Sequence, residues 1–360
     1  MNKNFWKSKQ VFVTGHTGFK GAWLCLWLQR LGAKVTGFSL PPPTNPSLFE
    51  VAEVGDGMSS VIGDIRDLSQ LRNAIKAQPP DVLFHMAAQS LVRRSYAEPI
   101  DTYSTNVMGT AHVLEAIRGL KTVRAVVIVT SDKCYENREW VWGYRENDRL
   151  GGYDPYASSK ACAELVTAAY RRSFFSDDAS GRTSVATVRA GNVIGGGDWA
   201  EDRLIPDAVR AFCAKRELLI RSPEAVRPWQ FVLEPLCGYL MLAEKLSGSG
   251  RDHADAWNFG PSAGSVATVE EVATILSKRW GEQAGWKAGE RSKLKETRAL
   301  NLDSSKSNTL LEWIPVLSLQ DTLEWTVEWY KSWHAGARMR MLSESQIQRY
   351  AERLGGDMSP

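Results

Sequence analysis

The sequence predicts an α/β fold with a doubly wound parallel sheet of the Rossmann type and a smaller mixed α/β lobe. Three observations support this: strands alternate with helices as far as residue 189, residues 125–130 form an unbroken apolar run, and a glycine loop follows the first strand. Such an apolar run is typical of a strand buried on both faces. With 360 residues and 43% hydrophobic composition, the chain can bury a core large enough for two lobes.

The first strand, loop and helix occupy residues 10–31. Gly15, Gly18 and Gly21 have the spacing G-x-x-G-x-x-G. The first glycine permits a tight turn, the second lets the backbone approach a pyrophosphate, and the third lets the helix pack close to the strand. The N–H groups at the start of that helix would face the pyrophosphate. The pattern favours a dinucleotide site, and an ordinary glycine turn is the alternative.

Further elements follow in alternation. We expect strands at 34–39, 58–62, 82–86, 125–130 and 185–189, and helices at 68–77 and 100–118. Gly109, inside the last of these helices, indicates close helix packing. The alternation loosens after residue 190, where loops increase.

This pattern predicts three parts of the chain. We expect a dinucleotide-binding Rossmann domain over 1–189, with a segment near 229–260 returning to it, and a substrate-binding lobe mainly over 190–330. Residues 331–360 form a polar C-terminal tail to which the sequence assigns no role.

Charge and cysteine content argue against several classes of protein. A net charge of +3, from 44 basic and 41 acidic residues, is too balanced for a dedicated nucleic-acid binder. The five cysteines include no C-x-x-C pair, which suits a reducing cytoplasm and gives no metal site. No apolar run approaches the ~20 residues that span a bilayer, and no secretory leader is recognisable. We therefore expect a cytoplasmic protein without a metal, a nucleic-acid partner or a membrane partner.

Tyr156 and Lys160 are the first candidates for catalysis. Their spacing places a phenol and an ammonium on one face of a helix, where the charge is expected to lower the phenol pKa. Such a tyrosine can exchange a proton with a sugar hydroxyl. The pattern also arises by chance, but its position favours function, because Thr130, Ser131 and Asp132 end a buried strand at the sheet edge where catalytic residues belong.

The chain resembles the extended short-chain dehydrogenase/reductases, which include the NAD-dependent epimerases and dehydratases, over roughly residues 8–330. The resemblance rests on the glycine loop, Asp64, residues 85–90, Asn106, Ser131 and the Tyr156/Lys160 pair. Within this family it is similar to the nucleotide-sugar 4,6-dehydratases that act on CDP-D-glucose. Residues 14–21 read TGHTGFKG, and the active-site strand ends Ser131-Asp132-Lys133, where the dTDP-glucose dehydratases have Thr-Asp-Glu.

The resemblance implies a reaction in which NAD+ accepts a hydride from C4 of the glucose and returns it to C6 after water has left across C5 and C6. It implies that Tyr156 is the base at the C4 hydroxyl, that Ser131 bonds the same hydroxyl, and that Asp132 protonates the departing C6 hydroxyl. Lys133 replaces the glutamate that takes the C5 proton in relatives. An ammonium is a poor base unless burial removes its charge, and Asp132 opposes that change. Either burial neutralises Lys133 so that it takes the C5 proton, or another group takes that proton; a solvated charge at the strand end is the alternative role for Lys133.

The resemblance also implies the residues that hold the cofactor. These are Gly15, Thr17, Gly18, Phe19, Lys20, Gly21, Asp64, Ile65, Ala87, Ala88, Gln89, Asn106, Thr130, Tyr156 and Lys160. A helix cap is the alternative for Asp64. The acid that usually bonds the adenosine ribose is absent, since Gly37-Phe38-Ser39 ends the second strand, and no arginine there suits a 2′-phosphate. NAD is therefore favoured over NADP, and weak binding would follow.

For the substrate, the resemblance implies contacts from Ser90, Asn192, Arg203, Leu204, Arg227 and Asn258. Arginine suits bidentate binding of a diphosphate, although isolated arginines are usually surface charges. Three alternatives stay open: a 4-epimerase, which lacks an acid such as Asp132, a dehydratase of another nucleotide-linked hexose, and a binding protein without chemistry. Relatives pair through helices near 100–118 and 156–172, which implies a homodimer or homotetramer.

Overall fold

The computed structural model describes residues 2–175, 183–248, 250–290 and 299–355. Its centre is a seven-stranded parallel sheet with the strand order β11-β6-β5-β4-β1-β2-β3. The strands are β1 (Gln10–Thr14), β2 (Lys34–Ser39), β3 (Ser59–Ile62), β4 (Val82–His85), β5 (Ala125–Val129), β6 (Ser184–Arg189) and β11 (Ala256–Asn258). The strand order reverses between β1 and β4, which is where doubly wound sheets bind ligands. The predicted fold class is confirmed.

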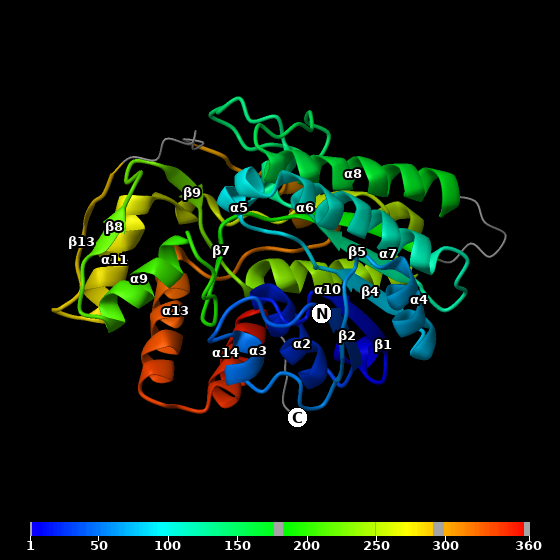
Figure 1. Ribbon diagram of the computed structural model, residues 1–360, viewed down its shortest axis with the longest axis horizontal. Coiled ribbons are helices and arrows are strands. Elements are labelled where there is room, and N and C mark those ends of the chain that lie inside the picture. The colour runs from blue at the N-terminus through cyan, green and yellow to red at the C-terminus, as the bar shows by residue number, and fades with distance from the viewer. Residues whose placement is uncertain (1, 176–182, 249, 291–298, 356–360) are drawn as a thin grey trace.

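Helices cover both faces of this sheet (Figure 1). On one face lie α2 (Phe19–Arg30) and α10 (Leu233–Gly248), and on the other lie α4 (Leu68–Ala77), α7 (Gly109–Ile117) and α8 (Pro155–Phe174). Successive residues of a strand join opposite cores. In β5, Val127 packs toward α2 and α10, whereas Val126 and Ile128 pack toward α4 and α7. This two-sided burial explains the unbroken apolar run.

The helix expected over 100–118 is present with an interruption. It comprises α6 (Pro99–Tyr103), a π-helical turn (Ser104–Met108) and α7. The close packing expected of Gly109 is not with a helix: a Cβ there would lie 2.5 Å from Cδ1 of Ile65, in the loop after β3. Because Gly109 has no side chain, the start of α7 packs directly against the loop that follows β3.

The second lobe lies at the left of Figure 1. It contains three two-stranded sheets, which pair β8 with β13, β9 with β12 and β7 with β10. Its elements are β7 (Val193–Ile194), α9 (Leu204–Cys213), β8 (Leu218–Ile220), β9 (Val226–Pro228), β10 (Gln230–Phe231), β12 (Val266–Thr268), α11 (Val269–Trp280) and β13 (Trp286–Ala288). Between them the chain returns to the main sheet, because α10 packs on β5 and β11 pairs with β6.

Several short elements complete the described chain. They are α1 (Lys3–Trp6), α3 (Leu48–Val51), α5 (Val92–Ala97), α12 (Ser305–Leu310) and the 3-10 turns Asp132–Cys134, Gly250–His253 and Ala263–Ser265. Within the described ranges, no helix has the length and apolar character needed to cross a membrane.

The C-terminal segment is part of the core, contrary to the expectation of a polar tail. It contains the end of α13 (Leu319–His334) and α14 (Met339–Arg353), and α14 packs against α2. The ring centroids of Tyr350 and Trp27 lie 5.6 Å apart. The Tyr350 hydroxyl donates to Oε2 of buried Glu234 at 2.7 Å, and the N–H of Leu317 donates to Oε1 at 2.7 Å. Residues 356–360 of the expected tail lie outside the described residues.

Glu234 gives the fold a predicted pH dependence. Burial raises the pKa of Glu234 to about 7, against hydrogen bonds that favour the carboxylate. The unfolded carboxyl ionises near its ordinary value, so between about pH 4.5 and 7 the folded state holds a proton that the unfolded state has lost. We expect this group to lower stability as pH rises through that window, by up to about 1.4 kcal/mol per pH unit.

We expect Glu234→Gln to remove this contribution. Thermal unfolding of the wild type and the variant at pH 5, 6, 7 and 8 would measure it, with exposed Glu324→Gln as the control. The stability of Glu234→Gln relative to the wild type should rise steadily up to about pH 7 and then stay constant. A constant gap at all four pH values would contradict the assignment.

Candidate active site

The glycine loop closes tightly on both the sheet and the helix. Gly15 has φ +77°, and a Cβ there would lie 2.6 Å from the Ala87 nitrogen. A Cβ on Gly21 would lie 2.1 Å from the Gly15 carbonyl oxygen, so this third glycine packs the helix on the loop itself and not on the strand. Gly18 is the N-cap of α2 and makes no side-chain cap bond. The first N–H groups of α2 therefore fit an anionic group such as a pyrophosphate.

The ribose side of this loop has hydroxyl groups and no carboxylate at the end of β2. Thr17 Oγ1 and Ser39 Oγ are 2.9 Å apart, and Thr17 also donates to the Leu40 carbonyl at 2.9 Å. The His16 ring lies directly over Gly37, where a Cβ would be 2.3 Å from the ring. This geometry fits a dinucleotide pyrophosphate and supplies no ribose-binding acid from β2.

Asp64 is held by an ion pair. Its carboxylate accepts from Arg66 at 2.6 to 3.0 Å, and the hydrogen bonds from Arg66 lower the pKa of Asp64. The alternative that Asp64 caps a helix is wrong, because Asp67 caps α4 through the N–H groups of Ser69 and Gln70. Ile65, the other residue expected near the adenine, is buried against Gly109.

Asn106 holds the loop that follows β4. Its Oδ1 accepts from the Gln89 N–H at 2.8 Å, while its Nδ2 donates to the Gln89 carbonyl at 3.0 Å and to Ser159 Oγ at 2.8 Å. The Gln89 side chain in turn donates to Thr102 Oγ1 at 2.9 Å. Asn106 and Gln89 are thus buried supports, whereas Ala88 and Ser90 line the adjoining cavity.

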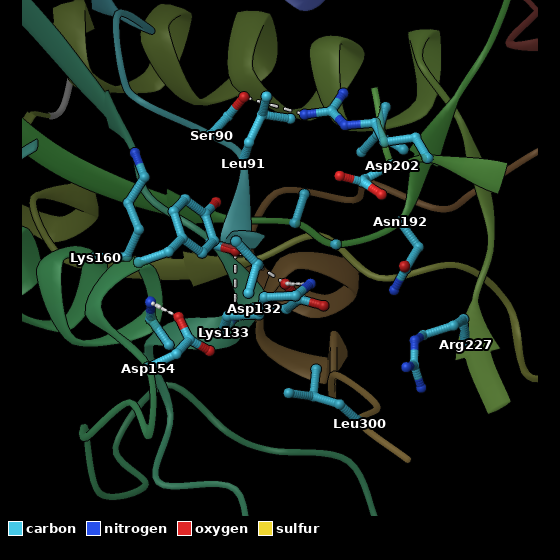
Figure 2. A pocket seen from close by; sticks show the side chains of 18 of the residues that line it. Ser90, Leu91, Asp132, Lys133, Asp154, Lys160, Asn192, Asp202, Arg227 and Leu300 are labelled. Atoms are coloured by element: carbon cyan, nitrogen blue, oxygen red, sulfur yellow. Dashed lines mark hydrogen bonds and ion pairs between the residues drawn. The ribbon is translucent and has the colours of Figure 1, made fainter. Parts of the chain in front are cut away.

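A cavity of about 1030 Å³ lies between the sheet edge and the second lobe (Figure 2). It brings together most of the residues expected for chemistry and substrate binding. The predicted residues that line it are Phe19, Lys20, Ala88, Ser90, Thr130, Ser131, Asp132, Lys133, Tyr156, Lys160, Asn192, Arg203, Leu204 and Arg227.

Ser131, Asp132 and Lys133 form a tight turn where β5 ends. Ser131 Oγ donates to Asp132 Oδ1 at 3.0 Å, and Lys133 Nζ lies 3.4 Å from the same oxygen. Asp132 is only 1% exposed, and its Oδ2 has no hydrogen-bond partner among the described residues. Gly191 makes room for this carboxylate, since a Cβ there would lie 1.8 Å from Oδ2. Lys133 keeps 35% of its side chain exposed.

Tyr156 begins helix α8, which Asp154 caps by accepting from the Ala157 N–H. The expectation that Lys160 lowers the phenol pKa is wrong for this state. Burial raises the pKa of Tyr156 to about 12, although a hydrogen bond with Ser131 opposes the shift. Lys160 Nζ donates instead to the Val129 carbonyl at 3.1 Å, and burial lowers the pKa of Lys160 to about 8. The physical reason is that a buried phenolate loses its hydration.

Lys20 adds a half-buried amine to the cavity wall. Its Nζ donates to the Tyr239 hydroxyl at 3.1 Å. Burial lowers the pKa of Lys20 to about 7, and the charges of Lys160 and Arg203 act in the same direction. The cavity therefore holds more than one amine that can lose a proton close to neutral pH.

The second lobe contributes a polar wall. Arg203 pairs with Asp198 at 2.9 Å and donates to Ser90 Oγ at 3.1 Å, which joins the two lobes. Asn192 has φ +47°, and its buried Nδ2 has no partner within the described chain. Arg227 reaches the cavity from β9, as Figure 2 shows.

Asn258 does not reach the cavity, contrary to the expectation of a substrate contact. Its Nδ2 donates to the carbonyls of Tyr144 and Asp303, and its Oδ1 accepts from the Tyr135 hydroxyl at 2.8 Å. Asn258 is fully buried in β11. Both polar atoms of the Asn258 side chain are thus hydrogen-bonded within the protein and are not directed at a substrate.

The sequence did not reveal several other cavity residues. Gly191 supports Asp132, and Arg93, Asp202 and Arg221 meet in one ion-pair group at the wall. These three charged residues come from distant segments and have no common spacing, so no motif could bring them together.

The fold and the Tyr156/Lys160 helix beside Ser131 define a short-chain dehydrogenase/reductase of the extended type. Comparison with known proteins agrees. A family model described as GDP-mannose 4,6 dehydratase matches residues 12–326, and the chain belongs to that family.

Among individual proteins, the chain is 52% identical to a CDP-glucose 4,6-dehydratase of Salmonella typhimurium over 97% of this chain and 98% of that protein. Two solved structures share the fold. A UDP-glucose-4-epimerase from Stenotrophomonas maltophila matches with a TM-score of 0.80 and 21% identity over 91% of this chain and 100% of that one. A dTDP-glucose 4,6-dehydratase from Bacillus anthracis in complex with NAD matches with a TM-score of 0.75 and 21% identity, covering 92% and 99%.

Gly191→Ala tests the contact with Asp132. The added methyl carbon would lie 1.8 Å from Oδ2 of Asp132, which is far too close for two unbonded atoms. We therefore expect the carboxylate to move and the Tm to fall by a few degrees. Gly248→Ala is the matched control, since a Cβ there meets no atom of the described residues within 4 Å. Thermal unfolding and a crystal structure of Gly191→Ala would check this. An unmoved Asp132 with an unchanged Tm would contradict the geometry.

Proposed function

We propose that this protein converts CDP-D-glucose to CDP-4-keto-6-deoxy-D-glucose and water, with NAD as a cofactor that is regenerated in each turnover. The observation that carries the proposal is the buried acid Asp132 beside Ser131 and Tyr156 in one cavity. The near full-length identity of 52% to a CDP-glucose 4,6-dehydratase supports the choice of nucleotide and reaction. The glycine loop and the free start of α2 support the cofactor.

Tyr156 and Ser131 would act at the C4 hydroxyl of the sugar. Bound NAD+ would supply the hydride acceptor and, later, the hydride donor. Tyr156 takes the C4 hydroxyl proton, and the Ser131 hydroxyl bonds the same oxygen. The raised pKa of Tyr156 means that its phenolate must be stabilised further when the site is filled, and the positive charges of Lys160 and the nicotinamide ring would both do so.

Asp132 would serve the elimination of water. The C4 ketone acidifies the C5 proton, and a protonated Asp132 carboxyl gives its proton to the departing C6 hydroxyl. We assign this transfer to Oδ2 of Asp132, which has no hydrogen-bond partner in the described chain. Lys133 is our candidate for the C5 proton because it lines the same cavity, and transfer of its own proton across the 3.4 Å to Asp132 would leave the amine neutral and the acid protonated.

The diphosphate would bind between the first domain and the second lobe. The donors would be Arg203, Arg227 and the Asn192 amide, whose Nδ2 has no partner among the described residues, and Ser90 and Leu204 would complete the wall. A 4-epimerase would share this arrangement but has no use for a buried acid beside the tyrosine. Asp132 therefore favours dehydration over epimerisation.

The proposal extends to assembly and setting. Exposed apolar side chains on the outer helices support a homodimer or homotetramer, with Ile100 on α6, Met108 in the π-helical turn, and Leu165 and Phe174 on α8. Free cysteines throughout the described chain support a cytoplasmic location. A 4-keto-6-deoxy sugar nucleotide would supply deoxysugar biosynthesis, such as that of the lipopolysaccharide O-antigen.

The first prediction of this proposal separates dehydration from epimerisation. CDP-glucose deuterated at C4 should give a product that carries the deuterium at C6, because one hydride is taken and returned within one cavity. Mass spectrometry and NMR of the product would locate the label. Deuterium at C4 of a galactose-configured product would show that the protein is an epimerase.

The second prediction concerns Lys133. If Lys133 removes the C5 proton, Lys133→Ala should keep C4 oxidation and then stall, so that the absorbance of NADH rises after mixing with substrate. We expect turnover to fall by about 10²-fold or more, as for the loss of a general base. Tyr156→Phe should instead prevent the absorbance from rising at all.

Lys133→Arg is the matched control for charge. Arginine keeps the positive charge but cannot lose its proton, so it should stall as Lys133→Ala does. Normal turnover by the arginine variant would show that only the charge matters. Normal turnover by both variants would show that another group, for which Lys20 is the available amine, takes the C5 proton.

A further inference from the structure

One ion-pair group crosses the cavity wall from the first domain to the second lobe. Arg93 in α5 and Arg221 after β8 both bond Oδ1 of Asp202, at 3.3 and 2.8 Å. All three side chains line the cavity and are between 30% and 41% exposed. In Figure 2, Asp202 and Lys160 lie on opposite sides of the cavity, so Asp202 is set apart from the catalytic lysine.

The backbone at Asp202 is held in an uncommon conformation. Asp202 has φ +58°, a region that residues other than glycine seldom adopt. The next residue, Arg203, also crosses the lobes, since it donates to Ser90 Oγ at 3.1 Å. The turn before α9 is therefore fixed so that two successive side chains contact the first domain.

The chemistry of this group is that of an anion site. Two guanidinium groups that share one carboxylate oxygen can equally hold a phosphate, because the arginine fork fits both. Partly exposed ion pairs are weak, so an entering anion with more charge can replace the carboxylate at little cost. Asp202 therefore fills a site that an anionic ligand would prefer to occupy.

We propose that Asp202 occupies an anion subsite between Arg93 and Arg221 and that one phosphate of the bound nucleotide sugar displaces it, while Arg203 and Arg227 hold the other. The identity of the phosphate rests on the proposed function, whereas the subsite itself rests on the geometry. Before binding, Asp202 keeps the two arginines paired and the two lobes joined. On binding, the phosphate replaces Asp202 between the arginines, and Asp202 competes with the ligand for them.

Inorganic pyrophosphate is the probe for this competition. Calorimetry with NAD+ present in excess would measure its Kd for the wild type and the variants. Because the competitor is removed, Asp202→Asn should tighten pyrophosphate binding by about three- to tenfold, the range expected for losing two exposed ion pairs. Glu201→Gln, which removes the same charge from the neighbouring exposed position, should change the Kd less than twofold.

The arginines supply the second arm. Arg93→Gln and Arg221→Gln should each weaken pyrophosphate binding several-fold. In a double variant that carries Asp202→Asn with either arginine substitution, the gain in affinity from Asp202→Asn should disappear. This double-variant test separates the subsite from pyrophosphate bound at the glycine loop, where Asp202 should have no effect. CDP should follow the same order of affinities.

Three results would overturn the proposal. If Asp202→Asn binds pyrophosphate no more tightly than the wild type does, Asp202 does not compete with the ligand. If Glu201→Gln gains as much affinity for pyrophosphate as Asp202→Asn does, the effect is one of long-range charge alone. Weaker binding of CDP with unchanged binding of pyrophosphate would make Asp202 a contact of the base. Since none of these measurements needs turnover, a failure of CDP-glucose dehydration would appear separately in the labelling experiment.

Discussion

A buried ion pair connects the elements on which the cavity depends. Arg189 of β6 bonds both carboxylate oxygens of Glu164 on α8, at 2.9 and 2.8 Å, and both side chains are 3% exposed. Thr130 and Thr187 donate to the same carboxylate at 2.5 and 2.7 Å. Burial raises the pKa of Glu164, but Arg189 and these hydroxyls hold it below its ordinary value. Removing one partner would leave a buried charge, at a cost of about 3 to 5 kcal/mol.

The position of this pair explains why the catalytic groups meet. Glu164 is one helical turn beyond Lys160 and two beyond Tyr156, and Thr130 immediately precedes Ser131. The pair therefore fixes the helix that carries the tyrosine against the strand that carries the serine and the acid. Arg189 also donates to the Tyr135 hydroxyl, which donates to Asn258. This explains why Asn258 supports the framework and does not contact the cavity.

Glycines place the remaining surfaces at contact distance. Gly15 and Gly21 let the loop, the helix and the end of β4 approach within the space of one methyl group, and Gly191 does the same beneath Asp132. The cavity is thus built from backbone on one side and from fixed charges on the other. The charges that join the lobes, Arg203 and the Asp202 group, are weaker and more exposed, so the lobes can adjust where the framework cannot.

The sequence alone determined the fold class, the glycine loop, six of the seven strands of the sheet and the grouping of Ser131, Asp132 and Tyr156, because these follow from local periodicity and from strand ends that share one edge. It did not reveal β11, which has only three residues and is too short to show a period. Only the tertiary structure decided the buried place of Asn258, the raised pKa of Tyr156, the core role of α14 and the meeting of Arg93, Asp202 and Arg221. The physical reason is that burial and pairing depend on neighbours distant in the chain. Local patterns record spacing along the chain, and desolvation and charge partners arise only when the segments pack.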